Sequence, residues 1–157
     1  MGDVKWAPGM SSAAGLTGTG INATLRDAAV ALARTSDVTV LVLGDVSGKH
    51  NGGCGEWGDR DSLDLQGGQL DLLDAVAGVA KKTIVVLVHG RPATFGAGNQ
   101  VLDRVDAMFS AFRPGEAFGA AMANLLSGET NPSGKLSQSW PRSVGEVGSG
   151  STPWLQA

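Results

Sequence analysis

Three short apolar runs, each followed by glycine, proline or charged residues, constrain the fold of this chain most strongly. They cover residues 38–43, 83–88 and 106–112, and the first two are almost entirely aliphatic. Continuous apolar runs of this length are typical of strands that are buried on both faces, as in parallel sheets. We therefore predict three strands, and we expect the first two to be covered on both sides by other parts of the chain.

Segments with helical periodicity separate these runs. Asn22 is a suitable N-cap for a helix that extends to about residue 34, and a second apolar stripe covers residues 68–82. A third helix is predicted for residues 116–126, where small side chains allow close packing on a sheet, and residues 4–6 are interpreted as a short edge strand. This alternation predicts an α/β fold with a mainly parallel sheet flanked by helices, which is an α/β sandwich with flavodoxin-like layering.

Length and composition indicate one globular domain. The 157 residues suit a single domain, for which we expect a core over residues 22–142 and a loosely held, Gly/Ser-rich tail over residues 143–157. The net charge of −3 gives no basic footprint, so nucleic acid is not an expected partner. No apolar run is long enough to span a bilayer, and no signal peptide is recognisable. We expect a soluble protein, cytoplasmic, or periplasmic or secreted if the chain is a fragment of a longer one.

The loops that follow the three strands are the predicted site. In a parallel sheet, residues 44–66, 89–98 and 113–116 would gather at the carboxyl edge, where ligands of open α/β sheets bind. The first loop holds Glu56 next to Trp57. An aromatic face beside a carboxyl group is typical of sugar-binding sites, and a nearby apolar ring raises the pKa of a carboxyl group, as a general acid requires. The alternative is a solvated glutamate, or one that pairs with Arg60.

Two further residues of this loop are candidates for substrate binding. Asp45 ends the first strand, where a carboxylate can bind sugar hydroxyls or simply form the turn after Gly44. Arg60 can contact substrate, although a local ion pair with Asp59 is the simpler interpretation.

No cofactor or metal is predicted. The Gly44 to Lys49 segment is one residue short of a phosphate-binding loop, and His50 stands where such a loop carries serine or threonine. His50, Cys54 and His89 lack the paired spacing of zinc ligands.

Five sequence blocks together resemble a known family. The chain carries Gly-Glu-Trp-Gly-Asp-Arg-Asp-Ser-Leu-Asp-Leu at 55–65, Gln-Leu-Asp-Leu-Leu-Asp-Ala-Val at 69–76 and Thr-Ile-Val-Val-Leu-Val-His-Gly-Arg-Pro at 83–92. Arg-Pro-Gly-Glu-Ala-Phe-Gly-Ala-Ala follows at 113–121, and Asn-Pro-Ser-Gly-Lys-Leu-Ser-Gln-Ser-Trp-Pro-Arg-Ser-Val-Gly at 131–145. In this order, from about residue 4 to residue 154, the blocks resemble the C-terminal α/β sandwich domain of glycoside hydrolase family 3.

The resemblance implies a retaining β-glucosidase-type enzyme that acts on β-linked glucosides or related sugars. In that family a preceding (β/α)8 barrel carries the aspartate nucleophile, and a loop of the second domain carries the acid/base glutamate, which matches Glu56 here. Trp57 would then form part of the sugar-binding wall, with Asp45 and Arg60 as further substrate-binding candidates. Asp45 is also the second choice for the acid/base. No barrel fits into 157 residues, and the family's Ser-Asp-Trp-type nucleophile segment is absent.

These departures lead to further expectations. The chain alone should have negligible hydrolase activity. The opening strand unit and the closing Gly-Tyr-Gly-Leu-Ser-type segment of the family domain also have no counterpart here, which should leave an apolar edge or face that favours self-association. The alternative function is a non-catalytic carbohydrate-binding or barrel-docking module. A flavodoxin-like nucleotide binder is a weaker third interpretation.

Overall fold

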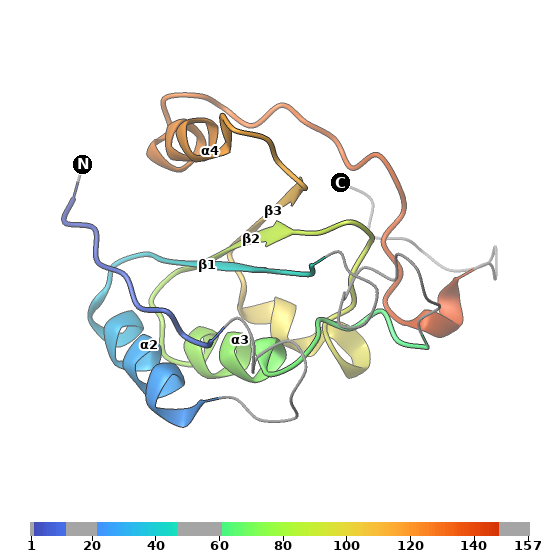
Figure 1. Ribbon diagram of the computed structural model, residues 1–157, viewed down its shortest axis with the longest axis horizontal. Coiled ribbons are helices and arrows are strands. Elements are labelled where there is room, and N and C mark those ends of the chain that lie inside the picture. The colour runs from blue at the N-terminus through green and yellow to red at the C-terminus, as the bar shows by residue number, and fades with distance from the viewer. Residues whose placement is uncertain (1, 12–21, 47–60, 148–157) are drawn as a thin grey trace.

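A parallel sheet of three strands forms the centre of the computed structural model, which describes residues 2–11, 22–46 and 61–147 (Figure 1). The strands β1 (Thr39–Gly44), β2 (Thr83–Val88) and β3 (Ala107–Phe112) lie in the order β1-β2-β3. Both pairs are parallel, so helical crossovers connect the strands, as the alternating sequence pattern predicts. The α/β fold and the parallel sheet are therefore confirmed.

The central strand β2 holds the sheet together because it pairs on both sides. Leu41 of β1 lies opposite Val85, and Leu43 lies opposite Leu87. Val85 and Leu87 are fully buried, since β2 is covered laterally by its neighbours and on one face by helices.

Two helices cover that face. The helix α2 (Ala23–Thr35) begins at Asn22, whose side chain accepts a hydrogen bond from the Leu25 N–H at 3.3 Å, as the N-cap prediction requires. The helix α3 (Gln69–Ala77) packs beside α2 and under the sheet (Figure 1). Leu72, Leu73 and Val76 of α3 join the strand residues in one core. The 3-10 segment η1 (Ala97–Arg104) precedes β3.

The other face of the sheet is largely open at β1, which corrects two predictions, whereas Val86 of β2 is buried there, as expected for the second strand. Val40 and Val42 of β1 are 39 % and 64 % exposed, so β1 is buried on one face and not on both. The helix α4 (Phe118–Ser127) lies on this side of the sheet (Figure 1), but none of its residues is buried. Its small residues therefore do not produce the close packing that we expected. Periodicity reports which residues are apolar, and it does not report whether a second layer is present to cover them.

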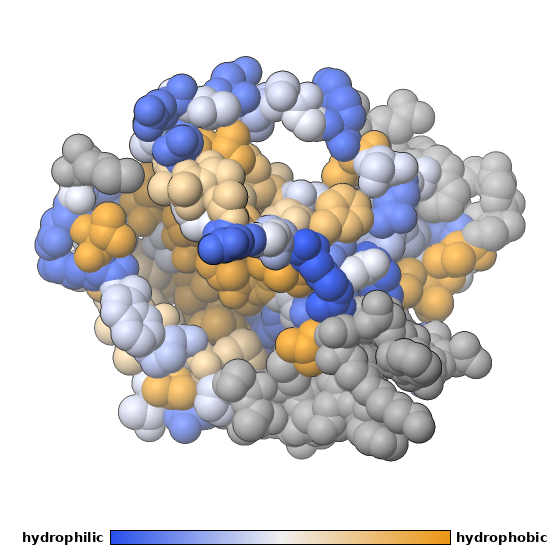
Figure 2. All heavy atoms as spheres, turned by 45° about the horizontal axis from the view of Figure 1, so that its top comes forward, coloured by the Kyte–Doolittle hydropathy of each residue, from blue (hydrophilic) through white to orange (hydrophobic). Residues whose placement is uncertain are grey.

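Beyond α4 the chain arches across this open side. Residues 127–139 are all exposed, and the chain returns to the core only at Trp140, before the short segment η2 (Val144–Glu146). Figure 2 shows a hollow under hydrophilic atoms, with apolar atoms on its floor. The self-association expected from such a surface stays a prediction.

The edge strand predicted for residues 4–6 is wrong. Residues 3–9 have no regular structure, and Val4 and Trp6 are each 82 % exposed. A strand of three residues needs a neighbour to pair with, and none of the described strands takes that place. None of the helices in the described ranges combines the length and the apolar character needed to cross a membrane.

Gly44 generates a prediction about the end of β1. A Cβ atom at this position would lie 1.8 Å from the backbone oxygen of Val88. We expect Gly44→Ala to lower the free energy of unfolding by at least about 2 kcal/mol, because the backbone must move apart. Gly119→Ala is the control, since nothing lies within 4 Å of its added Cβ. Urea unfolding of the two variants measures the difference, and equal stability would contradict the close approach.

Candidate functional site

Asp45 connects the three loops that follow the strands. It comes directly after β1, and its N–H donates to the Val88 oxygen at 3.0 Å. Its Oδ1 accepts from the Gly90 N–H and from Arg113 Nη2, each at 3.1 Å. The Asp45 side chain is only 7 % exposed, whereas the side chain of Arg113 is 37 % exposed and Gly90 lies at the surface, so the network joins a shielded carboxylate to exposed donors. The loops thus meet at the carboxyl edge of the sheet, where the sequence places the site.

The amide side chain of Gln69 fixes the end of β1 to the start of α3. Gln69 is 3 % exposed; its Oε1 accepts from the Gly44 N–H at 2.7 Å, and its Nε2 donates to the Gly44 oxygen at 2.8 Å. The same Nε2 donates to the Gln66 oxygen at 3.0 Å. These hydrogen bonds of Gln69 were not predicted from the sequence. The only indication of them is a glutamine at the start of an apolar helix stripe, where a buried polar side chain needs partners.

The segment that follows residue 60 is anchored at the same edge. Arg91 Nη1 and the Thr94 N–H both donate to the Leu63 oxygen, each at 2.9 Å. Asp64 Oδ1 accepts from the Gly96 N–H at 2.9 Å, and from the Thr94 hydroxyl. The β2-following loop therefore holds Leu63 and Asp64 in place.

The strongest catalytic candidate falls between these two anchors. Glu56, Trp57 and Arg60 lie outside the described residues, as do His50 and Cys54. Asp45 stands just before residues 47–60 and Leu63 just after them, and both are bonded to the loop that follows β2. Of the predicted site residues, the structure thus describes Asp45, at the centre of the edge.

His89 is a second polar group at this edge, and it is fully buried. Its Nδ1 lies 2.8 Å from the Arg91 oxygen, which can only accept, so Nδ1 carries the proton. Its Nε2 lies 2.8 Å from the Ser110 Oγ and accepts from that hydroxyl. Burial lowers the pKa of His89 below its ordinary value of 6.5, and the Arg91 oxygen only partly opposes this. The imidazole is therefore neutral and serves as a structural link between β2 and β3.

The described residues hold no group of three or more His, Cys, Asp or Glu side chains placed to bind a metal ion. The carboxyl edge instead holds backbone donors and charged side chains that are bonded to one another, which suits a site that positions a loop.

Known proteins are similar to this chain both in sequence and in fold. The family model for the glycosyl hydrolase family 3 C-terminal domain matches residues 2–154. A β-xylosidase of Formosa agariphila is 40 % identical over 119 residues, which are 76 % of this chain and 16 % of that protein. A periplasmic β-glucosidase of Salmonella typhimurium is 36 % identical over 77 % of this chain and 15 % of its own length.

Solved structures give the same result. The match to a family 3 β-glucosidase of Bifidobacterium adolescentis covers 89 % of this chain and 19 % of the β-glucosidase chain. Its TM-score is 0.73, and the two sequences are 31 % identical. The match to DesR, a β-glucosidase of Streptomyces venezuelae solved with D-glucose, covers 75 % of this chain and 14 % of the DesR chain. Its TM-score is 0.64, and the two sequences are 36 % identical.

These matches, together with the parallel sheet and its loop-bearing edge, define an α/β domain of the carbohydrate-hydrolase class. The chain belongs to glycoside hydrolase family 3, as a C-terminal domain. It spans about 15 % of the length of the two relatives described above.

Asp45 generates a prediction about the edge. We expect Asp45→Ala to lower the free energy of unfolding by about 0.5–1.5 kcal/mol, because it removes the acceptor of the Gly90 N–H and the partner of Arg113. Asp103→Ala removes an exposed carboxylate elsewhere and should be nearly neutral. Urea unfolding at pH 7 compares the two, and an Asp45 variant as stable as the Asp103 variant would show that the link is unimportant.

His89 generates a prediction about pH. The unfolded chain binds a proton at His89 near pH 6.5, whereas the folded chain does so only at lower pH. Stability should therefore be complete above about pH 6.5 and should fall as the pH is lowered below it. Urea unfolding between pH 7 and pH 5.5 measures this slope. His89→Phe should flatten this slope, and an unchanged slope in that variant would assign the pH dependence to another group.

Proposed function

We propose that this chain is the second domain of a retaining β-glucosidase-type enzyme, in which Glu56 is the general acid/base. The nucleophile would come from a (β/α)8 barrel domain, and the substrate would be a β-glucoside. The observation that carries the proposal is the family match over residues 2–154, to a domain that makes up about 15 % of the relatives' length.

The geometry of the carboxyl edge supports this assignment. The loop between β1 and α3 leaves the sheet at Asp45 and returns at Leu63, and both points are bonded to the β2-following loop. Buried hydrogen bonds from Gln69 add a third restraint at the start of the loop. A general acid must be held within hydrogen-bonding reach of the atom it protonates, so a loop fixed at both ends is suitable.

The chemistry then divides between two steps. Glu56 protonates the departing glycosidic oxygen while the nucleophile forms a covalent sugar intermediate. Glu56 next removes a proton from the water that releases the sugar. Trp57 would form an apolar wall for the sugar ring. Asp45 and Arg60 remain candidates for substrate binding, although the Asp45 carboxylate already accepts hydrogen bonds from Gly90 and Arg113.

The isolated chain should be inactive under this proposal. Retaining hydrolysis needs two carboxyl groups roughly 5–5.5 Å apart. Only one of them is assigned to this chain, so the reaction requires the barrel. Purified chain incubated with an aryl β-glucoside tests this, and robust turnover that Glu56→Gln abolishes would contradict it.

The acid/base role is tested by assembling the chain with a family 3 barrel domain. Glu56→Gln should lower kcat/KM for methyl β-glucoside by about 10²–10⁴-fold, because methoxide is a poor leaving group that needs a proton. The loss should be smaller in the glycosylation step with a dinitrophenyl β-glucoside, whose leaving group departs without protonation. Glu129→Gln is the matched control, since Glu129 is an exposed glutamate far along the chain.

Other outcomes separate the competing interpretations. If the assembled enzyme is active and Glu56→Gln is silent with both substrates, the chain is a carbohydrate-binding or docking module and the acid/base assignment is wrong. If Asp45→Asn produces the leaving-group dependence instead, the proton donor is Asp45.

A further inference from the structure

The outer side of β1 carries backbone groups that the described part of the chain does not pair. β1 is bonded to β2 alone, so it forms one edge of the sheet (Figure 1). In a strand, the N–H and C=O groups of one residue point to the same side, and this side alternates from residue to residue. The Thr39 and Asp45 N–H groups donate to the oxygens of Lys82 and Val88, so the odd-numbered residues face β2. The even-numbered residues therefore direct their backbone groups away from the sheet.

Gln69 closes one end of this outer side. It bonds to both backbone groups of Gly44, at 2.7 Å and 2.8 Å, which confirms that the even-numbered residues face outward. The same groups of Val40 and Val42 find no hydrogen-bond partner among the described residues, and Val38, directly before β1, continues the alternation. A row of unpaired N–H and C=O groups is a template for another strand. We call Val38, Val40 and Val42 the open edge.

The side chains of the open edge are apolar and unprotected. Val38, Val40 and Val42 are 52 %, 39 % and 64 % exposed, and they lie on the open face of the sheet. Natural edge strands are commonly protected by charged residues, proline or a bulge. Residues 38–44 contain no charged residue and no proline, and their pairing with β2 is regular. The open edge therefore suits an extended strand that presents aliphatic side chains on the same face.

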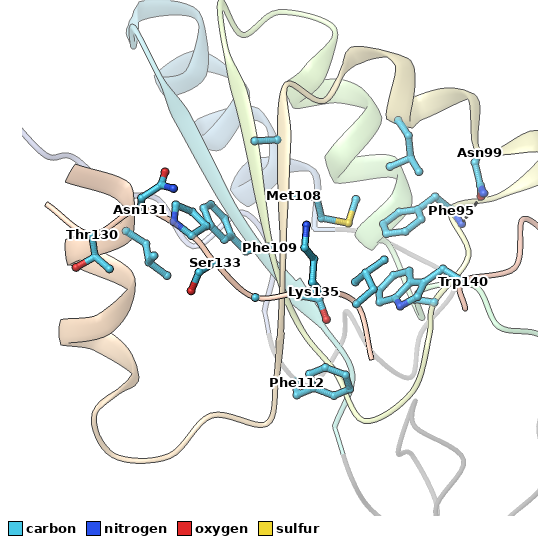
Figure 3. A pocket seen from close by; sticks show the side chains of 18 of the residues that line it. Phe95, Asn99, Met108, Phe109, Phe112, Thr130, Asn131, Ser133, Lys135 and Trp140 are labelled. Carbon is cyan, nitrogen blue, oxygen red and sulfur yellow. Dashed lines mark hydrogen bonds between the residues drawn. The ribbon is translucent and has the colours of Figure 1, made fainter. Parts of the chain in front are cut away.

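The opposite edge of the sheet, at β3, is less suited to pairing. Residues 130–136 line a pocket together with β3, and Figure 3 shows Ser133 and Lys135 of this segment lying across the strand. The register between β2 and β3 is also irregular, at Leu87 and Val88. Pairing of β1 with β3 of another copy would continue without limit, whereas pairing of β1 with β1 closes as a dimer. The regular, uncovered edge of β1 favours the closed arrangement.

We propose that the open edge binds the same edge of a second copy of this chain, so that the two sheets join across a two-fold axis. Antiparallel pairing centred on Val40 places Val40 opposite Val40 of the second copy and Val38 opposite Val42, each as a hydrogen-bonded pair. Every outward N–H then meets an outward C=O, and all the valines lie on one face. The pairing ends before Gly44, whose groups Gln69 already occupies. β1 thus supplies the donors, acceptors and side chains that its own edge requires.

Sedimentation velocity of the 157-residue chain over a range of concentrations tests this interface, and the chain should form reversible dimers. Val40→Lys brings two ammonium groups together at the axis, and Val40→Glu brings two carboxylates together. Each should weaken dimerisation at least about tenfold. An equimolar mixture of the two variants should restore dimers, because opposite charges then face each other. Val144→Lys is the matched control, since it adds the same charge at a 49 % exposed valine outside the sheet and should leave dimerisation unchanged.

Val42→Pro distinguishes pairing through the edge from stacking of the open faces. Proline removes an outward N–H that β2 does not use, and it keeps an apolar side chain on the open face. The folded variant, checked by circular dichroism, should remain monomeric. The mixture of Val40 variants decides the question independently of this variant. The proposal is overturned by a chain that stays monomeric up to millimolar concentration, by folded Val42→Pro that dimerises like the original chain, by open-ended polymers, or by a mixture that restores no dimers.

Discussion

The hydrogen bonds at the end of β1 are the constraint on which the rest of the structure depends. Gly44 approaches the Val88 oxygen so closely that no side chain fits, and Gln69 satisfies both backbone groups of Gly44. The next residue, Asp45, then reaches the two neighbouring loops. Because the buried amide of Gln69 is paired with both backbone groups of Gly44, the end of β1 has one defined arrangement. That arrangement fixes where the segment with Glu56 leaves the sheet.

The two faces of the sheet differ in a way that fits a domain of a larger protein. Leu41 and Leu43 are buried under α2 and α3, whereas Val40 and Val42 on the other face are exposed. The relatives described above are about six times longer than the region they share with this chain. An exposed apolar face of this kind marks a surface that association would stabilise. Both the open face of the sheet and the need for a second catalytic carboxyl group fit the proposal that this chain acts as one domain of a larger enzyme.

Sequence patterns correctly predicted the elements that depend on neighbouring residues along the chain. Helix α2, its Asn22 cap and the strand β2 follow from periodicity and from continuous apolar sequence. The convergence of the loops at Asp45 follows from parallel pairing alone. The burial of both faces of β1 was wrong because a sequence pattern cannot show that a covering layer is absent. The role of Gln69 was missed because it depends on Gly44, which lies 25 positions away in the sequence. Glu56, Trp57 and Arg60 stay predictions.

The distance between the Glu56 carboxyl group and the barrel nucleophile, in a crystal structure of the chain assembled with its barrel and a glucose-like inhibitor, is the most direct measurement. A retaining reaction with Glu56 as acid/base requires about 5–5.5 Å between the two carboxyl groups. It also requires Glu56 to lie about 2.6–3.2 Å from the position of the glycosidic oxygen. A Glu56 side chain directed away from the inhibitor, with another carboxyl group in that position, would contradict the account.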